Sequence, residues 1–164
     1  MKITRKSMLY DISNMAYLIA DTGEENRHTL HRVRDICEDG NIDRVNRVLA
    51  LAFSNVLTVL LPVIKQPRGG KSSSRPSEDF EICFRDDGIM KYHLTHERLF
   101  NIKETVREYM LCMVLADWLA VTLPEAADVW RFRAGKAMEN LAETVTALTA
   151  SSFTGGLRRR LSPF

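Results

Sequence analysis

The sequence predicts a mainly α-helical protein: about five helices in an antiparallel, bundle-like domain with one β-hairpin inserted at about residues 80–94. Three observations lead to this prediction. Apolar residues recur at helical spacing along most of the chain. The run Tyr109–Val121 is apolar on every face apart from Asp117, and such a helix has to be buried. Between residues 80 and 94 the apolar period changes to two, which is typical of strands.

The composition is that of an ordinary soluble globular chain, with 45% apolar and 27% charged residues among 164. We expect one helical domain over residues 1–154 and a flexible basic tail over 155–164. Three cysteines without a CxxC motif indicate free thiols in a reducing compartment, so we expect a cytoplasmic protein. The apolar N-terminal stretch is interrupted by Asp11 and Asn14, which argues against a signal peptide.

The first three helices are expected at Ser7–Asp21, Glu24–Glu38 and Asp43–Leu61. Each repeats apolar residues at helical spacing, and the third has the longest apolar stripe. Gly40 follows the second helix and suits the left-handed position after a helix end. Pro62 marks the end of the third, because proline disfavours helical geometry at the preceding residue.

Residues 66–77 are rich in proline, glycine and serine, so we expect a mobile loop there. The hairpin follows, and its register can be derived from the apolar alternation. A three-residue turn, Asp86–Gly88, places all the large apolar residues on one face and puts Gly88 at the left-handed position. The predicted cross-strand pairs are Phe84 with Met90, Ile82 with Tyr92, and Phe80 with Leu94.

Two long helices are expected after the hairpin, at Leu99–Val121 and at about Leu123–Ala150. The spacing of Thr122 and Glu125 suggests a capping box for the second, and Pro124 fits its first turn. A connection this short makes the two helices antiparallel neighbours.

Two weakly charged runs, Val48–Ile64 and Tyr109–Leu123, raise the question of membrane insertion. The first contains polar residues and Pro62, and the second is short and holds a carboxylate, which is costly in lipid. We therefore expect two buried helices and no membrane association.

Asp117 is the most prominent candidate residue, because it lies on a helix face of apolar residues. A carboxylate in such a place needs a partner or stays protonated. The topology makes Arg131 and Arg133, early in the antiparallel helix, the candidate partners. The alternatives are a structural ion pair, or a half-exposed face that meets another subunit. A catalytic or metal role lacks a second acid or histidine on the same face.

His28, His31 and Asp35 share one helix face and could present a metal ion. This face lies opposite the apolar stripe, so we expect it to be solvated. The segment Gly69–Ser72 only partly matches a phosphate-binding loop, and no nucleophile motif occurs. We therefore expect no enzyme activity, no metal and no cofactor.

Basic residues gather in the loop region and the tail, and the rest of the chain is mildly acidic. They are candidates for contact with a partner or, non-specifically, with DNA phosphates; a solubilising loop and a frayed tail are the alternative. The glycine pair 155–156 followed by arginines and Phe164 has the layout of an arm that could dock on a neighbouring subunit. The seven residues are Lys65, Arg68, Lys71, Arg75, Arg158, Arg159 and Arg160.

The segments Asp43–Phe53 and Glu108–Leu119, continuing to Trp130, resemble the small helical head–tail connector (adaptor) proteins of tailed bacteriophages. The resemblance lies in pattern and layout, so no functional residue is transferred. It implies a non-enzymatic assembly protein of a virion or prophage: a homo-oligomeric ring that contacts other virion proteins and lines a DNA channel. The location would then be the virion. Two alternatives remain: a helical metal-binding or enzymatic bundle, and a nucleic-acid-binding regulatory module.

Overall fold

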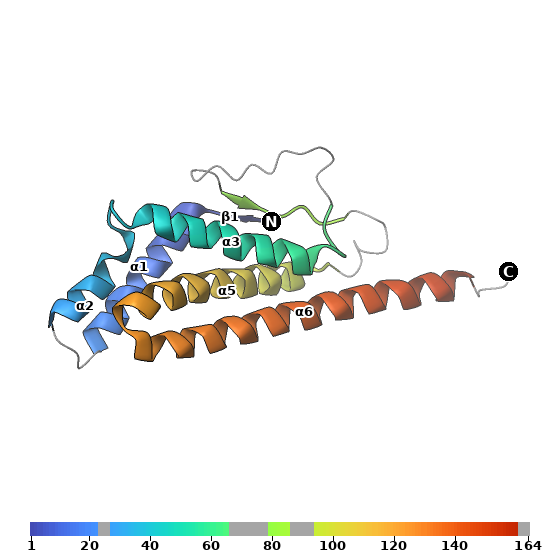
Figure 1. Cartoon of the computed structure of the whole chain (residues 1–164). Coiled ribbons are helices and arrows are strands. Elements are labelled where there is room, and N and C mark those ends of the chain that lie inside the picture. Colours follow the sequence, from blue (N-terminus) through green and yellow to red (C-terminus); the bar gives the residue numbers. More distant parts are fainter. Residues whose placement is uncertain (23–26, 66–78, 86–93, 161–164) are drawn as a thin grey trace.

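The computed structural model describes residues 1–22, 27–65, 79–85 and 94–160, and within them the chain is mainly helical with one small antiparallel sheet (Figure 1). The predicted fold class is confirmed. In chain order the elements are β1 (Lys2–Ile3), α1 (Arg5–Thr22), α2 (Arg27–Arg34), the 3-10 helix η1 (Asp35–Cys37), α3 (Ile42–Leu60), β2 (Phe80–Glu81), α5 (His96–Thr122) and α6 (Pro124–Arg160).

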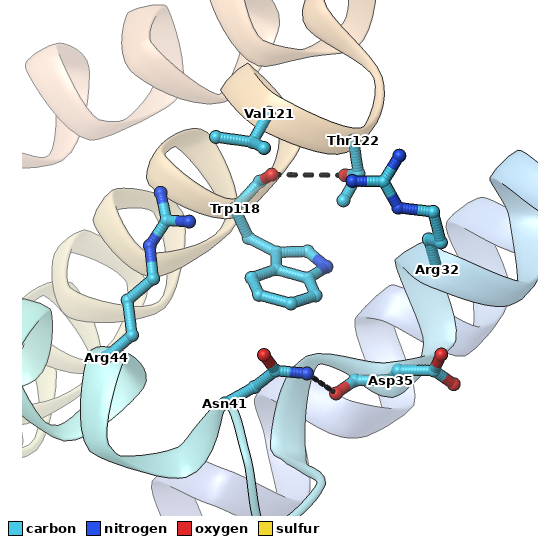
Figure 2. A pocket seen from close by; sticks show the side chains of 7 residues that line it. All are labelled: Arg32, Asp35, Asn41, Arg44, Trp118, Val121 and Thr122. Carbon is cyan, nitrogen blue, oxygen red and sulfur yellow. Dashed lines mark hydrogen bonds between the residues drawn. The ribbon is translucent and has the colours of Figure 1, made fainter.

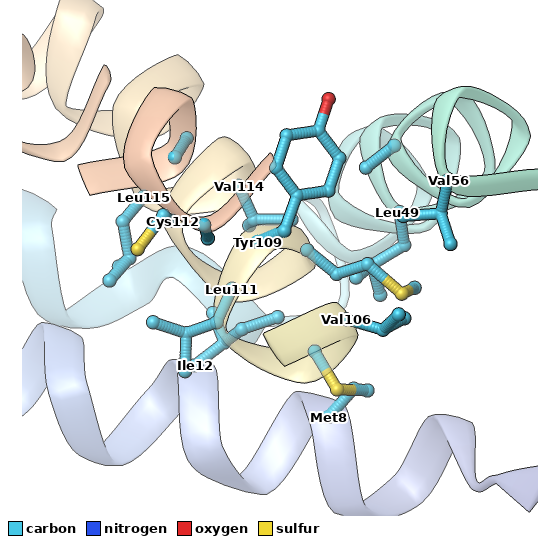
Figure 3. Close-up of a cluster of buried hydrophobic side chains, with 14 of the residues drawn as sticks. Met8, Ile12, Leu49, Val56, Val106, Tyr109, Leu111, Cys112, Val114 and Leu115 are labelled. Carbon is cyan, nitrogen blue, oxygen red and sulfur yellow. The ribbon is translucent and has the colours of Figure 1, made fainter. Parts of the chain in front are cut away.

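Helix α5 occupies the centre of the fold. It runs between α3 and α6, and α1 and α2 also pack against it (Figure 1). Figure 3 shows side chains of α1, such as Ile12, and of α3, such as Leu49, meeting the middle of α5. The prediction that this apolar helix is buried on nearly all sides is thus confirmed. Its buried residues are Ile102, Val106, Tyr109, Met110, Leu111, Cys112, Val114, Leu115, Ala116, Trp118, Leu119 and Thr122.

A single residue, Leu123, connects α5 to α6, which makes the two helices antiparallel neighbours as expected. Thr95 caps the start of α5, where its hydroxyl accepts a hydrogen bond from the Arg98 backbone N–H at 3.3 Å. The expected capping role of Thr122 is corrected. Thr122 belongs to α5 and its hydroxyl donates to the Trp118 carbonyl at 3.1 Å, because the preceding turn offers that acceptor four residues back.

Helix α6 is longer than predicted, with 37 residues and a length of about 55 Å. It continues through the glycine pair at 155–156 to Arg160, so the tail expected over 155–164 is helical as far as residue 160. Each glycine costs a helix only about 1 kcal/mol, so the pair weakens the helix without ending it. The side chains of 151–160 and residues 161–164 lie outside the described structure.

The small sheet pairs the start of the chain with the segment before α5. Ile3 lies opposite Phe80 in an antiparallel register, and Ile64 forms an isolated bridge with Phe84. The predicted alternation is present, since Phe80 and Ile82 are buried. β1 was not predicted as a strand. The predicted turn and most of the second hairpin strand fall in residues 86–93, outside the described residues, as does the mobile loop expected at 66–77.

Arg5 joins the sheet to the helical layer. Its guanidinium donates to Asn46 Oδ1 on α3 at 2.8 Å and lies 4.6 Å from the centroid of the Phe80 ring. Its backbone N–H donates to Asp79 Oδ1 at 3.0 Å. Burial lowers the pKa of Arg5. These contacts hold β1 and β2 against the helices, although two-residue strands have little stability of their own.

The central position of α5 predicts unequal effects of two leucine truncations. Leu115→Ala removes a fully buried side chain of α5 and should lower the free energy of unfolding by about 2–5 kcal/mol. Leu51→Ala, at a side chain 62% exposed on α3, should change it by less than about 0.5 kcal/mol. Urea unfolding followed by circular dichroism measures both. Equal losses would contradict the central placement of α5.

Candidate functional site

Asp117 of α5 is paired with Arg44, in the first turn of α3. Arg44 Nε donates to Asp117 Oδ2 at 2.8 Å, and Arg44 Nη2 donates to the Asp117 backbone carbonyl at 3.1 Å. The two side chains are 34% and 42% exposed. Asp117 is therefore a half-exposed, paired carboxylate rather than a buried charge.

The predicted partners Arg131 and Arg133 are wrong. Arg131 pairs with Asp128 in its own helix at 2.6 Å. Arg133 pairs with Glu108 of α5 at 2.9 Å and lies 4.6 Å from the Trp130 ring centroid. A helical wheel shows which residues share a face, but it does not show which neighbouring helix covers that face. The Asp117 face meets α3, not α6.

The sequence of α3 contains an indication that Arg44 is the partner of Asp117. Arg44 and Asn55 are eleven residues apart, about three helical turns, so they share one flank of the helix. Both reach α5: Asn55 Nδ2 donates to the Tyr109 hydroxyl at 3.2 Å, and Arg44 contacts Asp117. From Arg44 to Asn55 the chain advances along α3, whereas their partners on α5 go back from Asp117 to Tyr109. The two contacts therefore fix the antiparallel register of α3 on α5.

A pocket of about 320 Å³ opens beside this ion pair, where α2, the start of α3 and the end of α5 meet (Figure 2). In Figure 2 the Trp118 indole lies between the side chains of Arg44 and Arg32. The indole N–H donates to the Val33 carbonyl at 3.2 Å, which holds the ring in place. The pocket is lined by Arg32, Asp35, Asn41, Arg44, Trp118, Val121 and Thr122.

The polar groups of this pocket are mostly engaged in structural contacts. Asn41 Nδ2 donates to the Asp35 carbonyl at 2.8 Å, and Asp35 Oδ2 lies 3.0 Å from His31 Nδ1. Arg44 is held by Asp117. The lining therefore brings together no nucleophile with a general base, and its one carboxylate, Asp35, is engaged by His31.

Only part of the predicted histidine face of α2 lies among the described side chains. His31 and Asp35, four residues apart, form a pair at 3.0 Å, and His31 is largely exposed, as expected of a solvated face. The His28 side chain lies outside the described residues. Among the described side chains, no group of three or more possible metal ligands occurs.

The basic candidates are only partly placed. Lys65 is exposed, and its backbone N–H donates to the Cys83 carbonyl at 2.8 Å. Arg68, Lys71 and Arg75 lie outside the described residues, as does the segment Gly69–Ser72. Residues 158–160, the three arginines of the predicted tail, are the last three residues of α6.

Sequence reasoning missed the outward-facing apolar side chains of two helices. On α6, Val129 and Phe132 are 60% and 67% exposed. On α1, Tyr10, Tyr17 and Leu18 are each more than half exposed. The signal was available, because Val129 and Phe132 fall opposite the apolar stripe of α6 on a helical wheel. Such side chains, grouped on one helix face, are candidates for contact with a partner.

None of the helices that the structure describes has the length and apolar character needed to cross a membrane. Comparison with known proteins found no matching family model, no matching curated protein and no matching solved structure. The function therefore has to be inferred from the chain's own residues.

The Arg44–Asp117 pair should contribute measurably to stability. In a double-mutant cycle with Arg44→Met and Asp117→Asn, we expect a coupling free energy of about 1 kcal/mol at low salt and less at high salt. The pair Arg131–Asp128, more exposed at 57% and 83%, is the matched control and should couple by about 0.3 kcal/mol. Urea unfolding of the variants gives both values. A zero coupling for Arg44–Asp117 would contradict the assigned pairing.

The cysteines should differ strongly in reactivity. Burial raises the pKa of the Cys112 thiol to about 12, and Glu108 beside it acts in the same direction. At pH 8 only about one Cys112 in ten thousand would then be the reactive thiolate. Iodoacetamide followed by peptide mapping should show modification of the exposed Cys83 and none of Cys112 until denaturant is added. Rapid native labelling of Cys112 would show that α5 is not buried there.

Proposed function

We propose that this protein is a non-enzymatic structural subunit that assembles with copies of itself, as in the ring of a phage or prophage head–tail connector. The observation that carries the proposal is the outer face of α6, where Val129 and Phe132 are exposed side by side, one turn apart. Other virion proteins are the further partners that the connector resemblance implies.

Helix α6 lies at the edge of the fold and has two distinct faces. One face is buried against the rest of the molecule, chiefly α5. The opposite face is exposed along its whole described length. The buried residues are Ala127, Trp130, Ala134, Ala137, Leu141, Val145 and Leu148. The exposed residues include Glu125, Asp128, Val129, Phe132, Gly135, Lys136, Glu139 and Glu143.

An assembly role fits this arrangement better than a metal-binding or enzymatic bundle. A subunit needs an accessible face with apolar residues in a polar surround, and α6 has one. A metal-binding or enzymatic bundle needs converging ligands or an acid–base pair. Asp117 and His31 are instead engaged by Arg44 and Asp35.

The end of α6 supplies a basis for the DNA contact expected of a connector. Arg158, Arg159 and Arg160 close the helix, so each subunit of an assembly would contribute three arginines in succession. Contacts of this kind with DNA phosphates are non-specific and weaken steeply as salt is raised.

The proposal predicts a defined oligomer in solution. Light scattering on the full chain should give a mass that is a fixed multiple of 18.7 kDa over a range of concentrations. Added DNA should bind at low salt and dissociate as the salt concentration rises. A protein that remains a monomer at every concentration, with and without DNA, would contradict the proposed function.

A further inference from the structure

We infer that copies of this chain join head to tail, with the outer face of α6 in one copy packed against the outer face of α1 in the next. The inference rests on the proposed assembly function and specifies which two surfaces meet. A contact between two different surfaces is heterologous. In a pair of copies it leaves one α6 face and one α1 face unused, so a further copy can bind at either end.

The α6 face is the set of exposed residues around Phe132. It has an apolar centre, formed by Val129 and Phe132. Charged residues surround this centre, and four carboxylates outnumber the two cationic side chains, Arg131 and Lys136. Among the described residues, Glu125 and Glu143 have no ion pair, whereas Asp128 pairs with Arg131 and Glu139 with Lys136. These charged residues of the face are Glu125, Asp128, Arg131, Lys136, Glu139 and Glu143.

The α1 face is the exposed side of α1 and is aromatic. Tyr10 and Tyr17 are 68% and 54% exposed and lie two turns apart on the same side of the helix. Lys6 is exposed one turn before Tyr10. Arg34 of α2 lies over the Tyr17 ring at 4.7 Å from its centroid. Its charge is paired with Asp21 of α1, whose carboxylate lies 3.7 Å from the guanidinium, so Lys6 supplies the net positive charge of this face.

The chemistry of the two faces is complementary. Tyrosine hydroxyls can donate hydrogen bonds to carboxylates, and the rings offer apolar area to Val129 and Phe132. Lys6 gives the α1 face a net positive charge, and the surplus of carboxylates gives the α6 face a net negative charge. Two α6 faces packed on each other would instead bring eight carboxylates against four cationic side chains, and like-charge repulsion disfavours this surplus of negative charge.

The positions of the faces suit an assembly that preserves the fold. α1 and α6 each pack on α5 through their buried sides, so their outer sides can meet a neighbour while the core stays unchanged. Closure of the heterologous contact gives a ring, and failure to close gives a filament.

Two variants, each blocking one face, test the head-to-tail contact. Phe132→Glu blocks the α6 face and Tyr10→Glu blocks the α1 face, and both add a carboxylate where the side chain is mostly exposed. Each variant alone should fall to the monomer mass of 18.7 kDa in light scattering. An equimolar mixture should give a dimer of one copy of each, because each variant retains the surface that the other needs. Native mass spectrometry identifies this mixed dimer.

Leu51→Glu, at an equally exposed leucine on α3, is the matched control and should keep the wild-type mass. Unchanged circular dichroism melting shows that the variants are folded, and Tyr10→Ala serves as a milder block of the α1 face. Assembly of Tyr10→Glu alone would overturn the inference in favour of a contact between two α6 faces. Absence of the mixed dimer would also overturn it. A monomeric wild-type protein would instead remove the proposed function itself.

Discussion

The burial of α5 on nearly all sides is the constraint on which the rest of this structure depends. A helix with the consecutive buried residues Tyr109, Met110, Leu111 and Cys112, which point to different faces, gains stability only when other elements cover every face. Other helices of the same chain supply that cover, namely α1, α2, α3 and α6. Because α5 uses one side of each neighbour, the outer sides of α1 and α6 are left to solvent or to another molecule.

Polar contacts give this apolar core its register. Hydrophobic packing is non-directional, so it does not by itself fix how far one helix slides along another. Arg44 with Asp117 and Asn55 with Tyr109 fix α3 along α5, and the Trp118 N–H ties α5 to the Val33 carbonyl. Asp117 is therefore a positioning contact at a half-exposed edge of the helix pair, and it does not need a second subunit as partner.

Local patterns predicted the helices well, because apolar stripes such as that of α3 depend only on residues three or four apart. Pairings between residues far apart in the sequence could not be predicted from such local patterns. β1 joins β2 across nearly eighty residues, and Asp117 meets Arg44 of α3 rather than a residue of α6, the next helix in the chain. The end of α6 was placed too early, because two glycines weaken a helix without ending it. The exposed faces of α1 and α6 became visible only once the packing of both helices on α5 was known.

The central claim is that α5 is buried within one chain while α1 and α6 present the surfaces used for assembly. Hydrogen exchange measured by mass spectrometry over a range of protein concentrations tests it most directly, since exchange reports local opening of each helix. We expect α5 to exchange slowest at every concentration, and α1 and α6 to become slower as the concentration rises. Fast exchange throughout α5, or exchange in α1 and α6 that is independent of concentration, would contradict the claim.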